Sequence, residues 1–139
     1  MNYCDKYFSE LEKIAVIPEL AELDGKKLLV TGASGLILSP LVDALCYANE
    51  KNILHVDIYA AARTEEEISS RFTAYYGKPW LHYVYYDAVK PVEFDFKADY
   101  IIHGASNAHP AAYLSEPVET LLANVVGVNE LLKYAHTAG

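Results

Sequence analysis

Cysteine, basic side chains and long apolar runs are all scarce in this chain of 139 residues. The two cysteines, Cys4 and Cys46, form neither a CxxC pair nor a metal-ligand spacing, which favours two unpaired thiols in a reducing compartment. The N-terminus is charged and amphipathic rather than signal-like, and no apolar run approaches membrane-spanning length. These absences predict a cytoplasmic protein with no membrane partner.

The charge balance is acidic. Lys and Arg number 11 against 19 Asp and Glu, which gives a net charge of -8 and argues against a nucleic-acid partner. It does not exclude a small phosphorylated ligand, which a few backbone amides can hold. His55, His82 and His136 have no ligand spacing, so no metal site is predicted. With 53% hydrophobic and 22% charged residues, the composition is typical of one soluble globular domain.

Strand-like and helical patterns alternate along the chain. An amphipathic helical segment over residues 1–24, interrupted by Pro18, is expected to pack outside a domain that spans residues 25–139. The expected strands are 27–31, 53–61, 81–86 and 99–103, the expected helices are 36–48, 64–75 and 117–138, and the loop over 90–97 is expected to contain one helical turn. This order predicts an α/β fold, a Rossmann-like parallel sheet flanked by helices.

The stretch 26–39 combines a buried strand with a glycine turn and a helical pattern. Gly32 allows a tight turn, and Gly35 lets the backbone approach a pyrophosphate. Together with Ser34, the backbone amides of Leu36 and Ile37 are predicted to hold that phosphate at the helix start. An ordinary strand–turn–helix without a ligand is the alternative. Where a third glycine is expected the sequence has Leu38, which should push the helix outward or rotate it and so weaken the site.

The end of the second strand bears on the choice between NAD and NADP. NAD sites place Asp or Glu there, whereas Asp57 comes several residues too early. The strand is expected to end near Ala62, so Arg63 follows it. Because a guanidinium suits a 2′-phosphate, Arg63 favours NADP; a solvated surface charge is the alternative.

Four segments together match one family. Residues 31–39 (TGASGLILS) are similar to a TGxxGxxGS turn, Asp87 follows the third strand, residues 101–106 (IIHGAS) end the fourth, and residues 117–127 place Asn124 on the next helix. Over residues 26–139 the chain resembles the N-terminal part of the extended short-chain dehydrogenase/reductases, the NAD(P)-dependent sugar epimerase/dehydratase family. The resemblance supports the Rossmann-like fold and implies an NAD(P) cofactor.

Cofactor contacts follow from the resemblance residue by residue. Asp87 would accept the adenine amino group with the Ala88 backbone beside it, while Ala105 and Ser106 would line the nicotinamide-side ribose. Asn124 corresponds to the family's asparagine and completes the predicted cofactor residues. For Asp87, a turn residue that merely ends a strand is the alternative.

Residues 103–113 (HGASNAHPAAY) are most similar to the UDP-glucuronate decarboxylase branch of the family. Pro110 and Tyr113 match that branch, whereas Asn107 replaces a proline and His109 a small residue. His109 and Tyr113 are predicted to face a sugar substrate, and packing of a surface loop is the alternative.

The family's catalytic Tyr-x-x-x-Lys pair lies after a fifth strand, and no catalytic residue is assigned to this chain. Tyr47 with Lys51, and Tyr86 with Lys90, have the spacing but not the position. The chain is therefore expected to be an incomplete Rossmann domain, truncated after the fourth strand and its helix. It would lack the catalytic half and the substrate domain, and would be inactive alone.

Two functions of different classes remain open at this point. The first is the NAD(P)-binding portion of a nucleotide-sugar epimerase, dehydratase or decarboxylase that acts by transient hydride transfer. The second is a non-catalytic module that senses NAD(P) or scaffolds a partner; a reductase of a non-sugar carbonyl is a third reading. A nucleotide-sugar substrate and a homodimer through the apolar helix 118–132 are expected for the complete enzyme, and exposed apolar surface for this chain.

Overall fold

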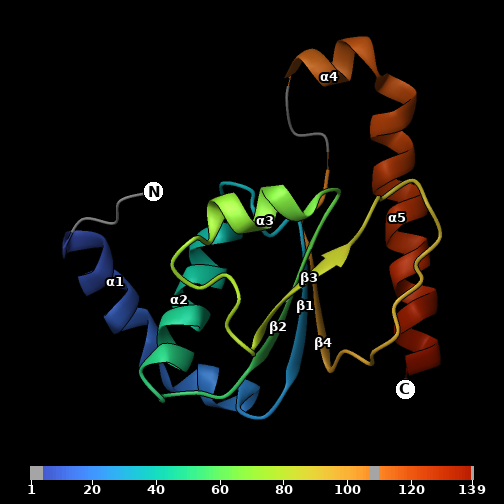
Figure 1. Cartoon of the computed structure of the whole chain (residues 1–139). Coiled ribbons are helices and arrows are strands. Elements are labelled where there is room, and N and C mark those ends of the chain that lie inside the picture. The colour runs from blue at the N-terminus through green and yellow to red at the C-terminus, as the bar shows by residue number, and fades with distance from the viewer. Residues whose placement is uncertain (1–4, 107–109, 139) are drawn as a thin grey trace.

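The computed structural model describes residues 5–106 and 110–138 as a parallel sheet with helices on both faces (Figure 1). The strands lie in the order β3-β2-β1-β4, as expected for a Rossmann-like fold. The elements are α1 (Asp5–Ala15), η1 (Pro18–Leu23), β1 (Lys27–Thr31), α2 (Ser39–Glu50), β2 (Asp57–Ala62), α3 (Glu65–Arg71), β3 (Leu81–Tyr85), β4 (Tyr100–His103), α4 (Pro110–Ser115) and α5 (Pro117–Ala138).

Strand β1 is the centre of the sheet. It pairs in parallel with β2 through Lys27↔Asp57 to Thr31↔Ala61, and with β4 through Leu28↔Tyr100 to Thr31↔His103. Because helices cover both faces, its apolar run is buried on both sides, with Leu29 and Val30 fully inaccessible. This strand has the bounds that the sequence predicts.

One face of the sheet is covered by α2 and α3, with α1 packed outside α2 (Figure 1). A continuous buried cluster fills the space beneath them, and it includes Val30, Leu45, Ile58 and Phe72. The helical segment ahead of the sheet is thus present as α1 and η1. Leu11 and Ala15 are its buried positions, which confirms the amphipathic pattern.

A buried ion pair joins the helices on this face. Arg71 of α3 donates from Nη2 to Asp43 Oδ2 over 2.6 Å and from Nη1 to Oδ1 over 3.3 Å, and Asp43 on α2 is fully buried. The Tyr7 hydroxyl of α1 donates to the same carboxylate over 2.6 Å. Burial and this carboxylate raise the pKa of Tyr7 to about 12, so the hydroxyl stays a donor. One carboxylate therefore ties three helices together.

The opposite face is covered by α5 and by the segment 86–99 (Figure 1). Aromatic rings do most of the packing there: Tyr59 of β2 stacks on Phe96 with ring centroids 3.7 Å apart, and Phe94 meets Tyr134 of α5 edge-on. The Tyr134 hydroxyl donates to the Phe96 carbonyl and accepts from the Ala98 amide. The segment contains no helix, so the helical turn predicted over 90–97 is wrong.

Two further predictions of secondary structure need correction. Strand β2 begins at Asp57 rather than at residue 53, because the Asn49 side chain pairs with both backbone groups of Val56 and holds the preceding residues to α2. The predicted helix 64–75 ends at Arg71, after which residues 72–77 turn. A further finding is α4, where a loop was expected; Pro110 at its first position is compatible with a helix start.

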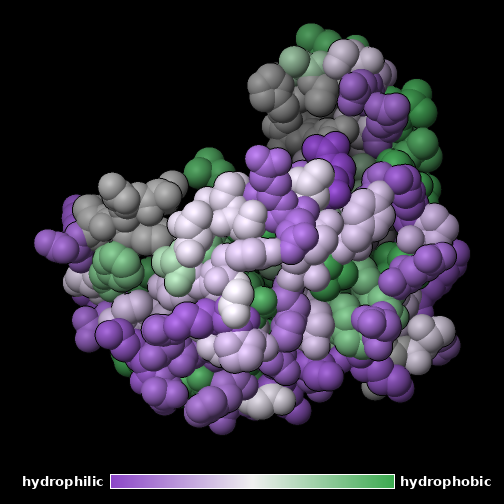
Figure 2. All heavy atoms as spheres, viewed as in Figure 1, coloured by the Kyte–Doolittle hydropathy of each residue, from purple (hydrophilic) through white to green (hydrophobic). Residues whose placement is uncertain are grey.

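Helix α5 exposes a long apolar stripe, as the sequence predicts. Its members are Val118, Leu121, Leu122, Val125, Val128 and Leu132. Figure 2 shows apolar residues on the part of the molecule that projects above the sheet, over α4 and the start of α5. No helix of the described chain is long and apolar enough to cross a membrane. The homodimer expected through this helix remains a prediction.

Candidate functional site

A cleft of about 830 Å³ lies where the carboxyl ends of the strands meet. The turn after β1, the end of β2 and the segments after β3 and β4 form its walls, and the start of α5 closes one side. Ten of the predicted cofactor residues line this cleft, namely Gly32, Ser34, Gly35, Leu36, Ile37, Arg63, Asp87, Ala88, Ala105 and Ser106. Ligands of open α/β sheets bind at this end of the strands.

The glycine turn touches the end of β4. Gly32 has φ +68°, a backbone conformation that strains other residues, and a Cβ there would lie 2.7 Å from the carbonyl carbon of Gly104. Both the backbone conformation and the lack of space therefore exclude a side chain. The turn is longer than predicted, because α2 begins only at Ser39. Leu36 and Ile37 are therefore in the turn rather than in the first helical turn, and their side chains are exposed.

Leu38, which replaces the third glycine, packs against Gly104. A Cβ on Gly104 would overlap Leu38 Cδ1, so the leucine fits because residue 104 has no side chain. Leu38 is also part of the cleft wall, and its predicted effect on the position of the helix and on the site stays a prediction.

The amino end of α2 has uncapped backbone N–H groups. Within the turn, Gly35 donates to Gly32 and Ser39 donates to Gly35, whereas the amides of Ser34, Leu36 and Ile37 have no acceptor in the described chain. No side chain caps the helix, and its first turn contains no acidic residue. Free N–H groups at the positive end of a helix dipole suit an anion such as a phosphate.

Arg63 directly follows β2 and lines the cleft with an exposed side chain, at the place the sequence predicts. Thr64 caps α3 by accepting from the Glu67 amide over 3.4 Å, and its hydroxyl donates to the Glu67 carboxylate. Glu67 also lines the cleft, which the sequence reading missed because it assigned this residue only to the cap. Asp57 starts β2 and is remote from this end.

After β3 the chain forms a turn that the side chain of Asp87 stabilises. Its Oδ1 accepts from the Val89 amide over 3.2 Å, and Lys90 Nζ lies 3.4 Å from its Oδ2. Beneath this turn, the buried Tyr86 hydroxyl has no hydrogen-bond partner in the described chain. Burial raises the pKa of Tyr86 to about 12. Tyr86 also lines the cleft and was missed, because its pattern reads as ordinary strand packing.

The end of β4 is held by Thr31. Thr31 Oγ1 lies 2.7 Å from His103 Nδ1 and accepts from the amides of Gly104 and Ala105. Ala105 and Ser106 continue this wall. His103 is half-buried, and burial lowers its pKa, so the imidazole is neutral near pH 7. The sequence reading placed His103 in a motif without assigning it a role.

Of the remaining predicted residues, Asn124 does not line the cleft. The exposed Asn124 side chain donates to the Thr120 carbonyl one turn earlier, while its neighbour Ala123 reaches the cleft. His109 lies outside the described residues, and Tyr113 belongs to α4 with a side chain outside the described set. Their roles stay predictions.

Neither Tyr–Lys pair resembles an acid–base pair. Lys51 Nζ lies over the Tyr47 ring at the carboxyl end of α2, away from the cleft. Lys90 Nζ donates a hydrogen bond to the hydroxyl of Tyr85 over 2.8 Å, whereas the buried hydroxyl of Tyr86 has no hydrogen-bond partner in the described chain. No group of three or more His, Cys, Asp or Glu that could hold a metal ion is found in residues 5–106 and 110–138.

The fold recurs in solved structures. A dTDP-glucose 4,6-dehydratase from Streptomyces venezuelae, solved as a double mutant with NAD bound, has a TM-score of 0.64 at 22% identity, covering 81% of this chain and 36% of that one. The yeast methylglyoxal/isovaleraldehyde reductase complexed with NADPH has a TM-score of 0.58 at 21% identity, covering 81% and 33%. At these identities the likeness shows the fold.

Similar sequences include UDP-glucuronic acid decarboxylase 4 of Arabidopsis thaliana, 32% identical over 113 residues, and UDP-glucuronic acid decarboxylase 1 of Danio rerio, 27% identical over 128 residues. These alignments cover 81% and 92% of this chain but only 24% and 29% of those proteins. The sequence profile of the NAD dependent epimerase/dehydratase family matches residues 28–139, which run from the second residue of β1 through α5. The chain belongs to the NAD dependent epimerase/dehydratase family.

Proposed function

We propose that this chain is the NAD(P)-binding portion of a nucleotide-sugar epimerase, dehydratase or decarboxylase, and that it prefers NADP. The observation that carries the proposal is the uncapped amino end of α2. The free amides of Ser34, Leu36 and Ile37 border a cleft at the carboxyl end of the strands, where dinucleotides bind in open α/β sheets. Such amides stabilise a pyrophosphate because folding has already oriented them. The likeness to UDP-glucuronic acid decarboxylases supports a nucleotide sugar as the substrate class.

Each wall of the cleft has a role in this proposal. The turn 32–37 holds the pyrophosphate, Asp87 and Ala88 hold the adenine, and Ala105 with Ser106 hold the second ribose. Arg63 pairs with a 2′-phosphate, which a carboxylate would repel. A bound nicotinamide would supply the site for reversible hydride transfer from the sugar carbon that carries the oxidised hydroxyl group, and the hydroxyl proton would go to a base. The chain's own residues bind and orient the dinucleotide, and none of them is assigned the acid–base step.

The opposing charge at the same end of the cleft is Glu67. Glu67 lines the same cleft as Arg63, and its negative charge would disfavour a second phosphate, so the contribution of Arg63 has to exceed that repulsion for NADP to be preferred. The relative affinity for NADP and NAD is therefore expected to depend on the side chains of Arg63 and Glu67, and substitutions at these two positions can measure it.

Calorimetric titration of the chain with NADPH and with NADH tests both parts of the proposal. We expect NADPH to bind more tightly, and Arg63→Met to weaken NADPH by about tenfold, since a charge-assisted hydrogen bond contributes about 1.5 kcal/mol or more. NADH affinity should stay within about twofold, because NADH has no 2′-phosphate.

The matched control is Lys51→Met, which removes an exposed cation at the far end of α2 and should leave both affinities unchanged. Equal binding of the two dinucleotides by the unaltered chain would refute the NADP preference alone. Failure of the unaltered, folded chain to bind either one would refute the cofactor assignment for this chain.

A further inference from the structure

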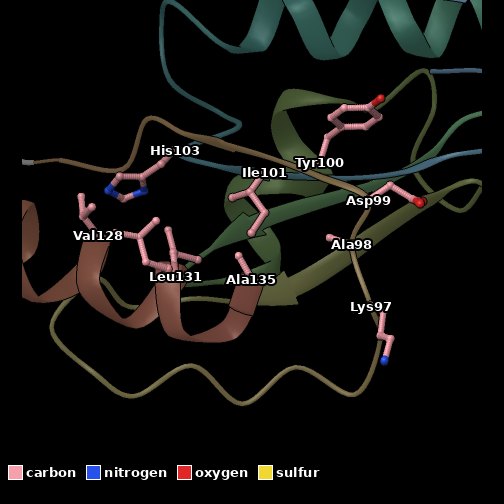
Figure 3. A pocket seen from close by; sticks show the side chains of 10 residues that line it. Lys97, Ala98, Asp99, Tyr100, Ile101, His103, Val128, Leu131 and Ala135 are labelled. Atoms are coloured by element: carbon pink, nitrogen blue, oxygen red, sulfur yellow. The ribbon is translucent and has the colours of Figure 1, made fainter. Parts of the chain in front are cut away.

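His103 lies at the junction of two hollows. It lines the cleft, and it also lines a groove of about 580 Å³ between β4 and α5, which we call the edge groove. Figure 3 shows the imidazole at the end of β4, beside Val128 and close to Leu131 of α5. Ile101, two residues earlier on the strand, points the same way into the groove (Figure 3). The imidazole ring therefore borders two hollows that could hold a ligand, while the backbone of His103 is part of β4.

The hydrogen bonds around Thr31 favour one tautomer of this ring. Thr31 is fully buried, and its Oγ1 accepts from the amide of Ala105 over 3.3 Å and from the amide of Gly104 over 3.2 Å. The Gly104 amide is shared, because it also donates to the Thr31 carbonyl over 3.0 Å. A hydroxyl oxygen has two lone pairs and one proton. With both lone pairs engaged, the proton points to the remaining neighbour, which is His103 Nδ1 at 2.7 Å. Nδ1 is therefore the acceptor, and the ring proton is on Nε2.

The opposite assignment leaves the buried Thr31 hydroxyl without an acceptor for its proton. If Nδ1 carried the proton, Thr31 Oγ1 would accept from Nδ1 and the Ala105 amide, and the Gly104 amide would keep the Thr31 carbonyl as its acceptor. The hydroxyl proton would then have no acceptor among its described neighbours. A buried hydroxyl whose proton has no acceptor is destabilising. The arrangement around Thr31 thus favours the tautomer of His103 that has its proton on Nε2.

Nε2 is open to a ligand. No hydrogen bond to it exists within residues 5–106 and 110–138, and Tyr86 Oη is the single fully covered side-chain nitrogen or oxygen without a partner in that part of the chain. The unpaired Nε2 therefore remains accessible. Tyr86 meets the imidazole edge-on, with ring centroids 6.2 Å apart, and helps to keep the ring in place.

We propose that Thr31 is a positioning residue that locks His103 with its proton on Nε2, so that the end of β4 presents an N–H donor to an oxygen atom of the bound dinucleotide or nucleotide sugar. The use of this donor by a ligand rests on the proposed function. The locked tautomer does not, because it follows from contacts within the protein alone.

Nitrogen NMR of the chain labelled with ¹⁵N-histidine tests the lock directly, since long-range proton–nitrogen spectra distinguish the two tautomers. His103→Gln assigns the signal among the five histidines. At pH 7.5 we expect Nδ1 unprotonated and Nε2 protonated. Thr31→Val should mix the tautomers, whereas Thr31→Ser, which keeps the hydroxyl, should preserve the lock. A protonated Nδ1 in the unaltered chain overturns the proposal, whether or not Thr31→Val folds.

The donor role is tested by adding NADPH or UDP-glucuronic acid, one at a time, to the same sample. A shift of the Nε2 signal with slowed exchange of its proton identifies which molecule supplies the oxygen. If calorimetry shows binding while the Nε2 signal stays unchanged with both, the donor role is refuted. If neither molecule binds, the proposed function is refuted, and the spectrum of the free chain still decides the tautomer.

Discussion

The two faces of the sheet are covered in different ways. Under α2 and α3 the side chains form one continuous apolar cluster with many fully buried members. Under α5 the buried members of the cluster in the described chain are Leu29, Ala61, Tyr86 and Leu131, and half-buried aromatics complete the packing. The α2 face thus has an extensive buried core. The α5 face has a small buried core, and α5 exposes apolar side chains on its outer side.

The polar contacts differ in the same sense. On the α2 face, Asp43 is fully buried and receives donors from Arg71 and Tyr7. On the α5 face, the Tyr86 hydroxyl is buried without a partner, and the hydroxyl of Tyr134 binds backbone groups of the covering segment. The comparison teaches that the stability of this domain is concentrated on the α2 face, while the α5 face retains surface for further contacts.

The largest effect should come from the buried ion pair. Arg71→Met keeps much of the apolar stem but leaves Asp43 without its cation, and removing one partner of a buried pair costs about 3–5 kcal/mol. We expect chemical denaturation to show that loss in the free energy of unfolding. Lys78→Met is the control, because its pair with Glu50 is exposed and contributes about 0–1 kcal/mol. Equal losses would contradict the distinction.

A pair of matched truncations compares the two faces directly. Leu45→Ala removes a fully buried side chain of α2 and should cost about 2–5 kcal/mol through lost burial and the cavity that remains. Leu132→Ala makes the same chemical change on α5, where the side chain is 64% exposed, and should stay within about 0.5 kcal/mol. A large loss for Leu132→Ala would mean that the stripe is covered in solution, and sedimentation would then reveal an assembly.

The smallest of the three effects concerns the contact between α5 and the turn after β3. A Cβ at Gly127 would lie 2.8 Å from the Ala88 carbonyl oxygen and 3.1 Å from Tyr86 Oη, so α5 comes this close only with glycine. Gly127→Ala should destabilise by about 1–2 kcal/mol, because overpacking outweighs the gain in helix propensity. Asn129→Ala, exposed on the same helix, should instead be neutral or slightly stabilising. A more stable Gly127→Ala chain would contradict this close approach.

Local pattern was sufficient for the parts of the molecule that are buried on both sides or that carry turn chemistry. β1 has its predicted bounds, Gly32 has the positive φ that its turn needs, and Thr64 caps α3 as its pattern indicates. Arg63 follows β2 directly, as predicted. In each case neighbouring residues supply the decisive physics, namely burial period, glycine stereochemistry or an N-cap hydroxyl.

Contacts between segments distant in the chain lie beyond such patterns. The fit of Leu38 depends on Gly104, and the tautomer proposed for His103 depends on Thr31, 72 residues earlier. Asn124 shows that a motif match does not fix the direction of a side chain. It lies on the predicted helix, but its side-chain amide donates to the Thr120 carbonyl of that helix.

The sequence of this chain is enough to specify an α/β family, a glycine turn and the dinucleotide class that the turn suits. Which groups line the cleft, which nitrogen of His103 faces it and which face of the sheet holds the stability depend on how the strands bring remote side chains together. Hydrogen-bond satisfaction and close packing are properties of pairs in space, and spacing along the chain does not encode them.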